Sequence, residues 1–278
     1  MDWNIAKKMV IFILIVLNAV LFFFNYKGTQ DYKISQAREK AVIDVLSDRN
    51  IYIYTELEYD YSPMRKINIS PIYLTRDDIV NTFFKDEDAK ISIEFGNNII
   101  KSDTKTVTYK DNNLQVIYNQ YDDVIKDFDY EKAEKISKDM LLKIEGNNNK
   151  YSILDVIELD YGYTFIYCEK YKGNYIYPSR YEITVNNKGV ESIIAMYCNI
   201  EGYIDEKSEI YGVDEALFTF SDYIINSATV DKIEMAYDYQ SKDKDGVDIS
   251  SKIVPYYFIY VMEEEKPYMV NAYTNKIR

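Results

Sequence analysis

The stretch from residue 163 to residue 198 reads YTFIYCEKYKGNYIYPSRYEITVNNKGVESIIAMYC and holds the clearest strand signals of the chain. Gly173-Asn174 and Asn187-Lys188-Gly189 interrupt it twice. Glycine and asparagine tolerate the left-handed backbone conformations that tight hairpin turns need. The pattern therefore predicts a three-stranded antiparallel meander. Its strands are expected at 163–171, 175–186 and 190–198.

Outside the meander, amphipathic helices alternate with short strands. Thr75 is a predicted N-cap followed by Asp77 and Asp78, and Gly146 is a predicted helix end. Helices are expected at 31–49, after Thr75, at 130–145 and at 213–226. Strands are expected at 51–55, 90–95, 104–109, 113–119, 230–240, 252–262 and 267–273. Asn97-Asn98 is a predicted turn, and the segment with Pro63 and Pro71 is a predicted loop.

This order predicts an α+β fold. Helices would pack on antiparallel, curled sheets in repeated helix-then-strands units, preceded by one transmembrane helix. The short linkers predict an N-terminal lobe at 26–125 and a C-terminal lobe at 126–278.

The run Met9–Phe24 reads MVIFILIVLNAVLFFF and contains one polar residue, Asn18. Its sixteen residues would rise about 24 Å, short of a hydrocarbon core of about 30 Å. Lys7 and Lys8 could extend it by snorkelling, and Trp3 and Tyr26 could mark the two interfaces. The sequence therefore predicts an anchor at 9–25 after a cytoplasmic stub at 1–8. A cleaved signal peptide is disfavoured because no A-x-A pattern follows the run.

Lysine and arginine counts on the two flanks of this run leave the orientation open. Asn18 also allows two interpretations. It could be a passenger bonded to its own helix, or it could contact another membrane helix. Asn18→Leu would weaken partner association only in the second case.

Composition argues against several classes of protein. The net charge of −13 disfavours nucleic-acid binding, and the absence of histidine removes His-based triads and His-ligated zinc. Cys168 and Cys198 are expected about 9.6 Å apart in the meander, beyond the limit of about 7 Å for a disulfide. They are predicted to be thiols within strands. No cofactor or metal is expected, because the calcium-loop-like segment at 241–246 has lysine at its twelfth position, Lys252. A hairpin turn at Asp245-Gly246 is the preferred interpretation.

Several segments resemble a known family. The chain opens Met1-Asp2-Trp3, followed by a lysine pair and an apolar run with an asparagine, and continues with VLSDRNI at 45–51. Further matching segments are YKGNYIY at 171–177, ITVNNKGV at 183–190 and YMVNAYTNKI at 268–277. Together they resemble the YycI regulatory family, which with YycH assists the cell-wall two-component system of low-GC Gram-positive bacteria. The ending is also similar to PepSY-type domains, although Asn275 stands where glycine is usual.

The resemblance implies a non-catalytic regulator. It implies a cytoplasmic N-terminus, one membrane helix and an extracytoplasmic domain that binds a sensor histidine kinase and a YycH-like protein. Trp3, Lys7, Lys8, Asn18 and Tyr26 would be the residues that contact lipid or a partner helix. Two alternatives stay open: an anchored ligand-binding or protease-inhibiting PepSY-like module, and a wall hydrolase that uses paired carboxylates.

Overall fold

The structure is a computed structural model of the chain. It describes residues 3–30, 32, 34–57, 60–85, 87–119, 124–146, 150–240 and 251–278. The chain divides into two compact units, and each is assembled from separate stretches of sequence. Unit 1 comprises 1–64, 207–233 and 259–278, and unit 2 comprises 65–206 and 234–258. The predicted lobes at 26–125 and 126–278 are consecutive in sequence and differ from this division.

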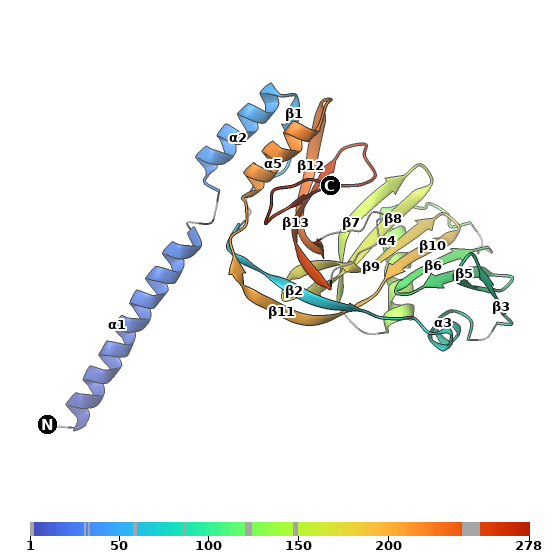
Figure 1. The fold of residues 1–278 in the computed structure, drawn as a ribbon, viewed down its shortest axis with the longest axis horizontal. Helices are drawn as coiled ribbons and strands as arrows, with labels where there is room; N and C mark the ends of the chain where they lie inside the picture. Colours follow the sequence, from blue (N-terminus) through green and yellow to red (C-terminus); the bar gives the residue numbers. More distant parts are fainter. Residues whose placement is uncertain are drawn as a thin grey trace. The chain divides into compact units, whose positions relative to one another are not determined.

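Five helices and fourteen strands are assigned in the described part of the chain (Figure 1). The helices are α1 (Trp3–Gln30), α2 (Gln36–Asp48), α3 (Arg76–Phe83), α4 (Tyr130–Glu145) and α5 (Val213–Tyr223). The first seven strands are β1 (Ile51–Ile53), β2 (Met64–Pro71), β3 (Lys90–Glu94), β4 (Asn97–Lys101), β5 (Lys105–Lys110), β6 (Asn113–Tyr118) and β7 (Tyr151–Leu159). The others are β8 (Gly162–Tyr171), β9 (Asn174–Asn186), β10 (Gly189–Met196), β11 (Cys198–Ser208), β12 (Ala228–Tyr239), β13 (Lys252–Val261) and β14 (Tyr268–Asn271).

The predicted meander is confirmed as β8, β9 and β10, which pair antiparallel in sequence order. Its first turn is one residue earlier than predicted, at Lys172-Gly173, and Asn174 already belongs to β9. Its register places Phe165 opposite Ile183, and Ile183 opposite Ile193. The same row of cross-strand partners extends over β6, β5, β4 and β3 to Ile91. Its members are Phe165, Ile183, Ile193, Val116, Val107, Ile100 and Ile91. Most of this apolar row is fully buried, so it forms the floor of the unit 2 core.

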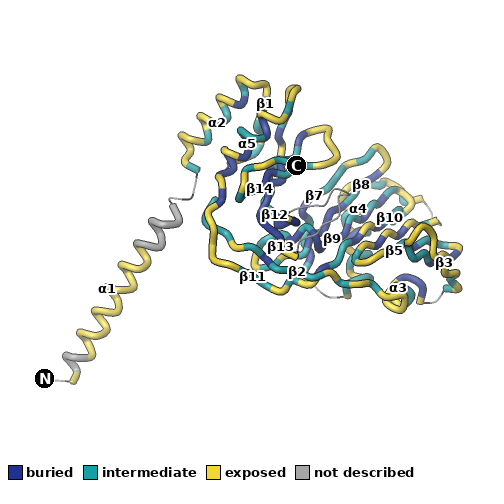
Figure 2. The backbone as a smooth tube through the Cα atoms, in the orientation of Figure 1, coloured by how far each residue is buried: buried dark blue, intermediate teal, exposed yellow. Residues whose placement is uncertain are grey.

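Helix α4 covers this floor. Asp129 caps it by accepting a hydrogen bond from the backbone N–H of Lys132, and it ends at Gly146, as predicted. Ala133 is fully buried in the core, and the hydroxyl groups of Ser137 and Tyr167 share a hydrogen bond of 2.6 Å. Figure 2 shows buried residues along β9, on which α4 packs. The helix therefore packs on the sheet through Ala133 and Ser137 together with half-buried apolar side chains such as Ile136 and Met140.

The sheet contains strands that the sequence analysis missed. Asn97-Asn98 was expected to be a turn but lies in β4, because the turn is Phe95-Gly96, where both residues have positive φ. β7 was missed because its register shifts between Ile153 and Asp155, which breaks the period-2 pattern. β2 and β11 were also missed. β2 lies in a segment read as a loop because of its prolines, and β11 is rich in charged residues.

Unit 1 combines α2, α5, β1 and β14 with parts of β12 and β13. Its predicted helix at 31–49 is the shorter α2, and the helix predicted at 213–226 ends at Tyr223 as α5. Arg38 of α2 donates to Asp214 of α5 at 2.8 Å, and Arg49 donates to Ser221 of α5 at 2.8 Å. These contacts hold the two helices together within the unit.

The prediction of purely antiparallel sheets is wrong. In unit 1, β1 pairs parallel with β12 from Ile51 opposite Ala228. In unit 2, β12 pairs parallel with β9 at Ala236 and Tyr237. The sheet is mixed, because chain segments that are remote in sequence enter it beside one another.

The predicted membrane anchor is wrong as well. Among the described residues, no helix combines the length and the apolarity that crossing a membrane requires. The apolar run Met9–Phe24 is too short, because its helical rise of about 24 Å is less than the hydrocarbon thickness of about 30 Å. Two charged residues, Lys7 and Lys8, directly precede the run. The fold prediction that began with a transmembrane helix and the single-pass membrane localisation are both corrected by this finding.

The cysteines are buried thiols, as predicted, although the expected register differs in detail. Cys168 lies opposite Arg180, next to a register shift between β8 and β9. Cys198 is the first residue of β11 and not the end of β10. The segment 241–250, which contains the calcium-loop-like sequence and the expected Asp245-Gly246 turn, lies outside the described residues.

Candidate functional site

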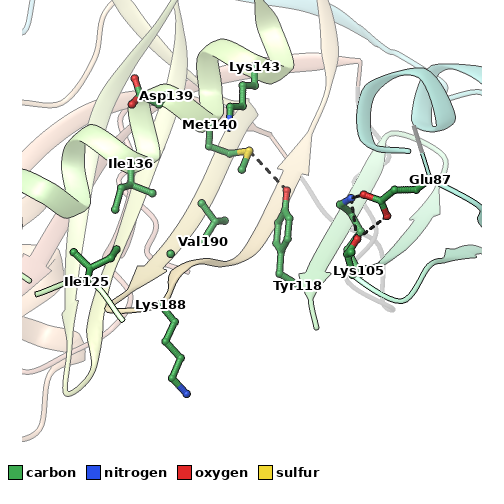
Figure 3. A pocket seen from close by; sticks show the side chains of 12 residues that line it. Glu87, Lys105, Tyr118, Ile125, Ile136, Asp139, Met140, Lys143, Lys188 and Val190 are labelled. Atoms are coloured by element: carbon green, nitrogen blue, oxygen red, sulfur yellow. Dashed lines mark hydrogen bonds and ion pairs between the residues drawn. The ribbon is translucent and has the colours of Figure 1, made fainter. Parts of the chain in front are cut away.

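Unit 2 contains a cavity of about 580 Å³ at the side of α4. Figure 3 shows Ile136 and Met140 of α4 on one wall and Tyr118 of β6 facing them. The turn between β9 and β10 forms a further wall through Lys188, Gly189 and Val190. The complete lining is Glu87, Thr104, Lys105, Tyr118, Ile125, Ile136, Asp139, Met140, Lys143, Lys188, Gly189 and Val190.

Helix α4 presents both apolar and charged side chains to the cavity. Ile136 and Met140 are half-buried and pack against the core of unit 2, whereas Asp139 and Lys143 are exposed. Residues three and four apart lie on one helix face, so Ile136, Met140 and Lys143 follow one another along the cavity. The arrangement places an apolar surface beside a cation in the last turn of the helix, where the helix dipole favours positive charge.

A second cavity of about 250 Å³ adjoins the first. Both cavities are lined by Lys105, Tyr118, Met140 and Lys143. The hydroxyl of Tyr118 donates a hydrogen bond to the Sδ of Met140 at 3.7 Å. This contact joins β6 to α4 and forms part of the wall of each cavity.

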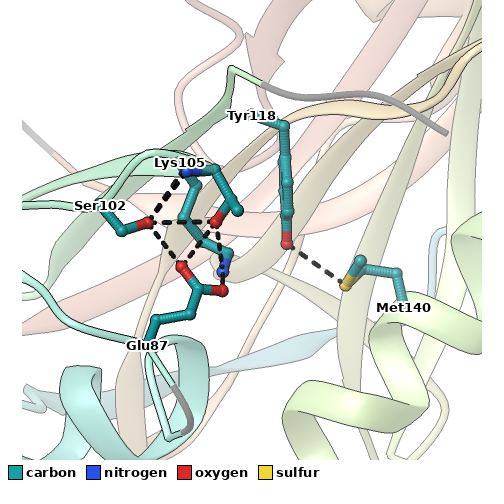
Figure 4. Close-up of polar contacts among 6 residues, drawn as sticks. Glu87, Ser102, Lys105, Tyr118 and Met140 are labelled. Atoms are coloured by element: carbon teal, nitrogen blue, oxygen red, sulfur yellow. Dashed lines mark hydrogen bonds and ion pairs between the residues drawn. The ribbon is translucent and has the colours of Figure 1, made fainter.

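A polar cluster closes one side of the cavity (Figure 4). Glu87, which follows α3, accepts hydrogen bonds from Ser102 at 2.5 Å and from Thr104 at 2.6 Å. The ammonium of Lys105 donates to the other oxygen of Glu87 and to the hydroxyl of Thr104. Lys105 is only 8% exposed, so the carboxylate of Glu87 neutralises a buried cation.

Aromatic rings complete the surroundings of Lys105. Its Nζ lies 5.2 Å from the ring centre of Phe84 and 6.0 Å from that of Tyr118. A cation over an aromatic face is attracted by the ring quadrupole. The lysine is therefore held by an anion, a hydroxyl and two rings, and it serves as a fixed wall of the cavity.

The cluster determines the ionisation of its neighbours. Partial burial raises the pKa of Glu87, but the hydrogen bonds from Lys105, Ser102 and Thr104 lower it to about 2. Burial, together with the negative charge of Glu87, raises the pKa of Tyr118 to about 12. Near neutral pH, Glu87 is an ionised acceptor with its oxygens occupied, and Tyr118 is a neutral phenol. Glu87 is thus unsuited to the proton donation that a carboxylate-dependent hydrolase needs.

The remaining charged groups lie at the rim. Lys143 and Lys188 are exposed cations, and Asp139 is an exposed carboxylate. Lys105 and Glu87 form an ion pair on one wall. The rim carries two lysines and one carboxylate beside the apolar surface.

The structure does not bring the predicted site residues to this cavity. Trp3, Lys7, Lys8 and Asn18 are exposed on α1, and Lys7 lies 5.4 Å from the ring centre of Trp3. Tyr26 is also in α1, but its side chain lies outside the described residues. Among the cavity residues, Lys188 and Gly189 were singled out from the sequence only as part of a predicted turn, and none was predicted as a site residue. The amphipathic pattern of 130–145 was the one available signal, because it predicted a helix with an apolar face.

Within the described ranges, no group of three or more acidic or cysteine side chains gathers as metal ligands would. A comparison with protein families finds no matching model, and no curated protein matches the chain. Two solved structures are similar at low identity. An uncharacterized protein from Eubacterium rectale ATCC 33656 has a TM-score of 0.47 and 16% identity over 82% of this chain and 90% of that chain. The Bacillus megaterium YpeB C-terminal domain has a TM-score of 0.39 and 13% identity over 88% of this chain and 97% of that chain. Neither likeness assigns a ligand to the cavity.

Proposed function

We propose that the chain is a binding protein without catalytic activity, and that its unit 2 cavity receives an amphipathic organic anion. The observation that carries this proposal is the cavity of about 580 Å³ with an apolar wall beside two rim lysines. Small-molecule sites typically have volumes of roughly 300–1,000 Å³ and combine apolar walls with a few charged groups. The apolar part of the ligand would lie against Ile136, Met140 and Val190.

The charge preference follows from the rim. Lys143 and Lys188 would attract a carboxylate or phosphate, and Asp139 would repel it. Lys105 is already neutralised by Glu87 and would contribute no net charge. Lys143, which lies next to the apolar side chains of Ile136 and Met140 on α4, therefore favours an anionic head group over a cationic one of the same shape.

The test uses the full chain with methyl-labelled methionine and isoleucine, titrated with octanoate and, separately, with octylammonium. Octanoate is expected to shift the Met140 and Ile136 methyl resonances in a saturable way, and octylammonium is expected to have a much smaller effect. Lys143→Gln should weaken octanoate binding several-fold. Lys135→Gln, on an exposed position of the same helix outside the cavity, is the matched control. Equal binding of both probes, or no saturable shift, would contradict the proposal.

The resemblance to the YycI family supports a second proposal, that the chain tunes a sensor histidine kinase together with a YycH-like protein. The resembling segments at 171–177 and 183–190 are the two hairpin turns of the meander with their flanking strand residues. Such turns can present contact residues on a rigid sheet. Autophosphorylation of the purified kinase, with and without the full chain, would measure the effect. Unchanged kinase output in cells that lack the chain would argue against this proposal.

A further inference from the structure

The strand β3 is the last strand of its sheet and pairs only with β4 among the described strands. All five of its residues, Lys90, Ile91, Ser92, Ile93 and Glu94, are exposed. Figure 1 shows β3 at the end of the sheet, and the region is coloured as exposed in Figure 2. An edge strand with open backbone groups is a template for pairing with another strand.

The hairpin geometry identifies which backbone groups are open. Glu94 lies opposite Asn97 across the two-residue turn Phe95-Gly96. In a hairpin of this type the residues that flank the turn form a hydrogen-bonded pair, and such pairs alternate with non-hydrogen-bonded pairs along the ladder. Glu94, Ser92 and Lys90 therefore direct their N–H and C=O groups to β4. The N–H and C=O groups of Ile91 and Ile93 point to the open edge.

The side chains of β3 are complementary to a second copy of the same strand. In an antiparallel pair centred on Ser92, Lys90 lies opposite Glu94 of the second copy, and Ile91 lies opposite Ile93. The outward backbone groups of Ile91 and Ile93 then meet in hydrogen-bonded pairs, as the ladder requires. Ser92 donates a hydrogen bond of 3.2 Å to Glu94, which holds the carboxylate over the strand.

The single copy leaves a charge conflict that this pairing would relieve. Lys90 lies directly opposite Lys101 of β4, and like charges at opposed positions destabilise a ladder. A second copy would place Glu94 on the other side of Lys90. The apolar face of β3 is also only partly covered. Ile91 ends the buried row that includes Ile100 and Val107, yet it is 44% exposed, and Ile93 is 75% exposed.

The turn next to β3 presents a further exposed apolar side chain, Phe95. Phe95 has a φ of 50°, in the left-handed region that bulky residues rarely adopt, and its side chain is fully exposed. The positive φ follows from the two-residue turn, and the exposed ring offers a large apolar contact area. It lies at the end of β3, next to Glu94.

We propose that two copies of this chain pair antiparallel through β3, centred on Ser92, so that the two sheets become continuous. The interface is isologous, since each contact occurs twice. The alternative is that Lys90 and Glu94 are charges that prevent edge-to-edge association. In the antiparallel pair Lys90 lies opposite Glu94 of the second copy, so these charges attract and do not prevent self-association. The sign of this charge contact distinguishes the two interpretations.

The test is a charge exchange followed by sedimentation velocity over a dilution series of the full chain, from about 1 mM to about 1 μM. The wild-type chain is expected to form dimers. Lys90→Glu and Glu94→Lys should each weaken the dimer at least about tenfold, because each creates two like-charge contacts. The double variant should recover dimerisation. An equimolar mixture of the two single variants should form mixed dimers, because their strands are then fully complementary.

Lys110→Glu, an exposed charge change of the same size at the end of β5, is the control and should leave the dimer unchanged. Circular dichroism would verify that every variant is folded, as expected for exposed positions. A wild-type chain that is monomeric throughout the series would overturn the proposal. So would a dimer that is insensitive to the single exchanges, or a mixture that associates no better than its components. These outcomes do not depend on ligand binding in the cavity.

Discussion

The hydroxyl of Tyr118 donates a hydrogen bond to the sulfur of Met140, and both residues line the two adjoining cavities of unit 2. One residue comes from β6 and the other from α4, so this contact links the sheet to the helix at the point where the cavities meet. It also offers a way to change the space available without touching the charged rim.

Met140→Ala should enlarge the shared wall and lower the free energy of unfolding by about 1–2 kcal/mol, because the side chain is half-buried. If the cavity holds an alkyl chain, the variant should also favour decanoate over octanoate relative to the wild type. Urea unfolding and parallel titrations with the two carboxylates measure these effects. Leu142→Ala, at an exposed position of α4, is the control. A chain-length preference identical to that of the wild type would place the ligand elsewhere.

Glu87→Gln should lower the free energy of unfolding by about 2 kcal/mol near neutral pH, because Lys105 would then be a poorly paired buried cation. The folded chain lowers the pKa of Glu87 from 4.5 to about 2. The stability that the ionised carboxylate contributes is therefore fully present above about pH 4.5 and is lost as the pH falls toward about 2.

The difference between the wild type and Glu87→Gln should shrink over that pH window, as measured by urea unfolding. Glu158→Gln, at an exposed position of β7, should show no such difference. If the difference in free energy of unfolding between the wild type and Glu87→Gln stayed constant down to about pH 2, ionisation of Glu87 would not be the source of the stability difference.

The two thiols should be unreactive in the folded chain. Cys168 is fully buried, and burial raises the pKa of Cys198 to about 12. Since the thiolate is the reactive form, iodoacetamide at mildly alkaline pH should modify the folded chain roughly a hundredfold more slowly than the unfolded chain. Mass spectrometry with and without urea measures the rates. Rapid labelling without denaturant would show that the β8 or β11 region opens.

Gly162→Ala should destabilise the meander. A Cβ at Gly162 would lie 2.1 Å from the carbonyl oxygen of Val185, so the backbone of β8 or β9 would have to move. We expect a loss of about 2–3 kcal/mol. Gly173→Ala is the comparison, because no atom lies within 4 Å of its Cβ position and its φ of +90° adds only a conformational cost of about 1 kcal/mol. Thermal or urea unfolding should rank the two variants in this order, and the reverse order would refute the packing argument.

Local signals in the sequence located some elements well. Thr75 caps α3 in a capping box with Asp78, and Asp129 and Gly146 bound α4. These features were predictable because a cap or a hairpin turn depends on a few neighbouring residues. The same reasoning failed at Asn97-Asn98, since two adjacent candidate turns compete there and strand pairing favours Phe95-Gly96. Local reasoning also failed for the run Met9–Phe24. The flanking residues were expected to lengthen it into a membrane-spanning helix, but no described helix is long and apolar enough to cross a membrane.

The sequence by itself determined the helix caps of α3 and α4, the meander turns to within one residue and the apolar alternation of β9, because each depends on interactions between near neighbours. Only the tertiary structure decided that β1 pairs parallel with β12, and that Glu87, Tyr118, Met140 and Lys188 surround one cavity. Such contacts join residues that are far apart along the chain. Their energy comes from burial and pairing after the segments meet, and no local pattern encodes which segments will meet.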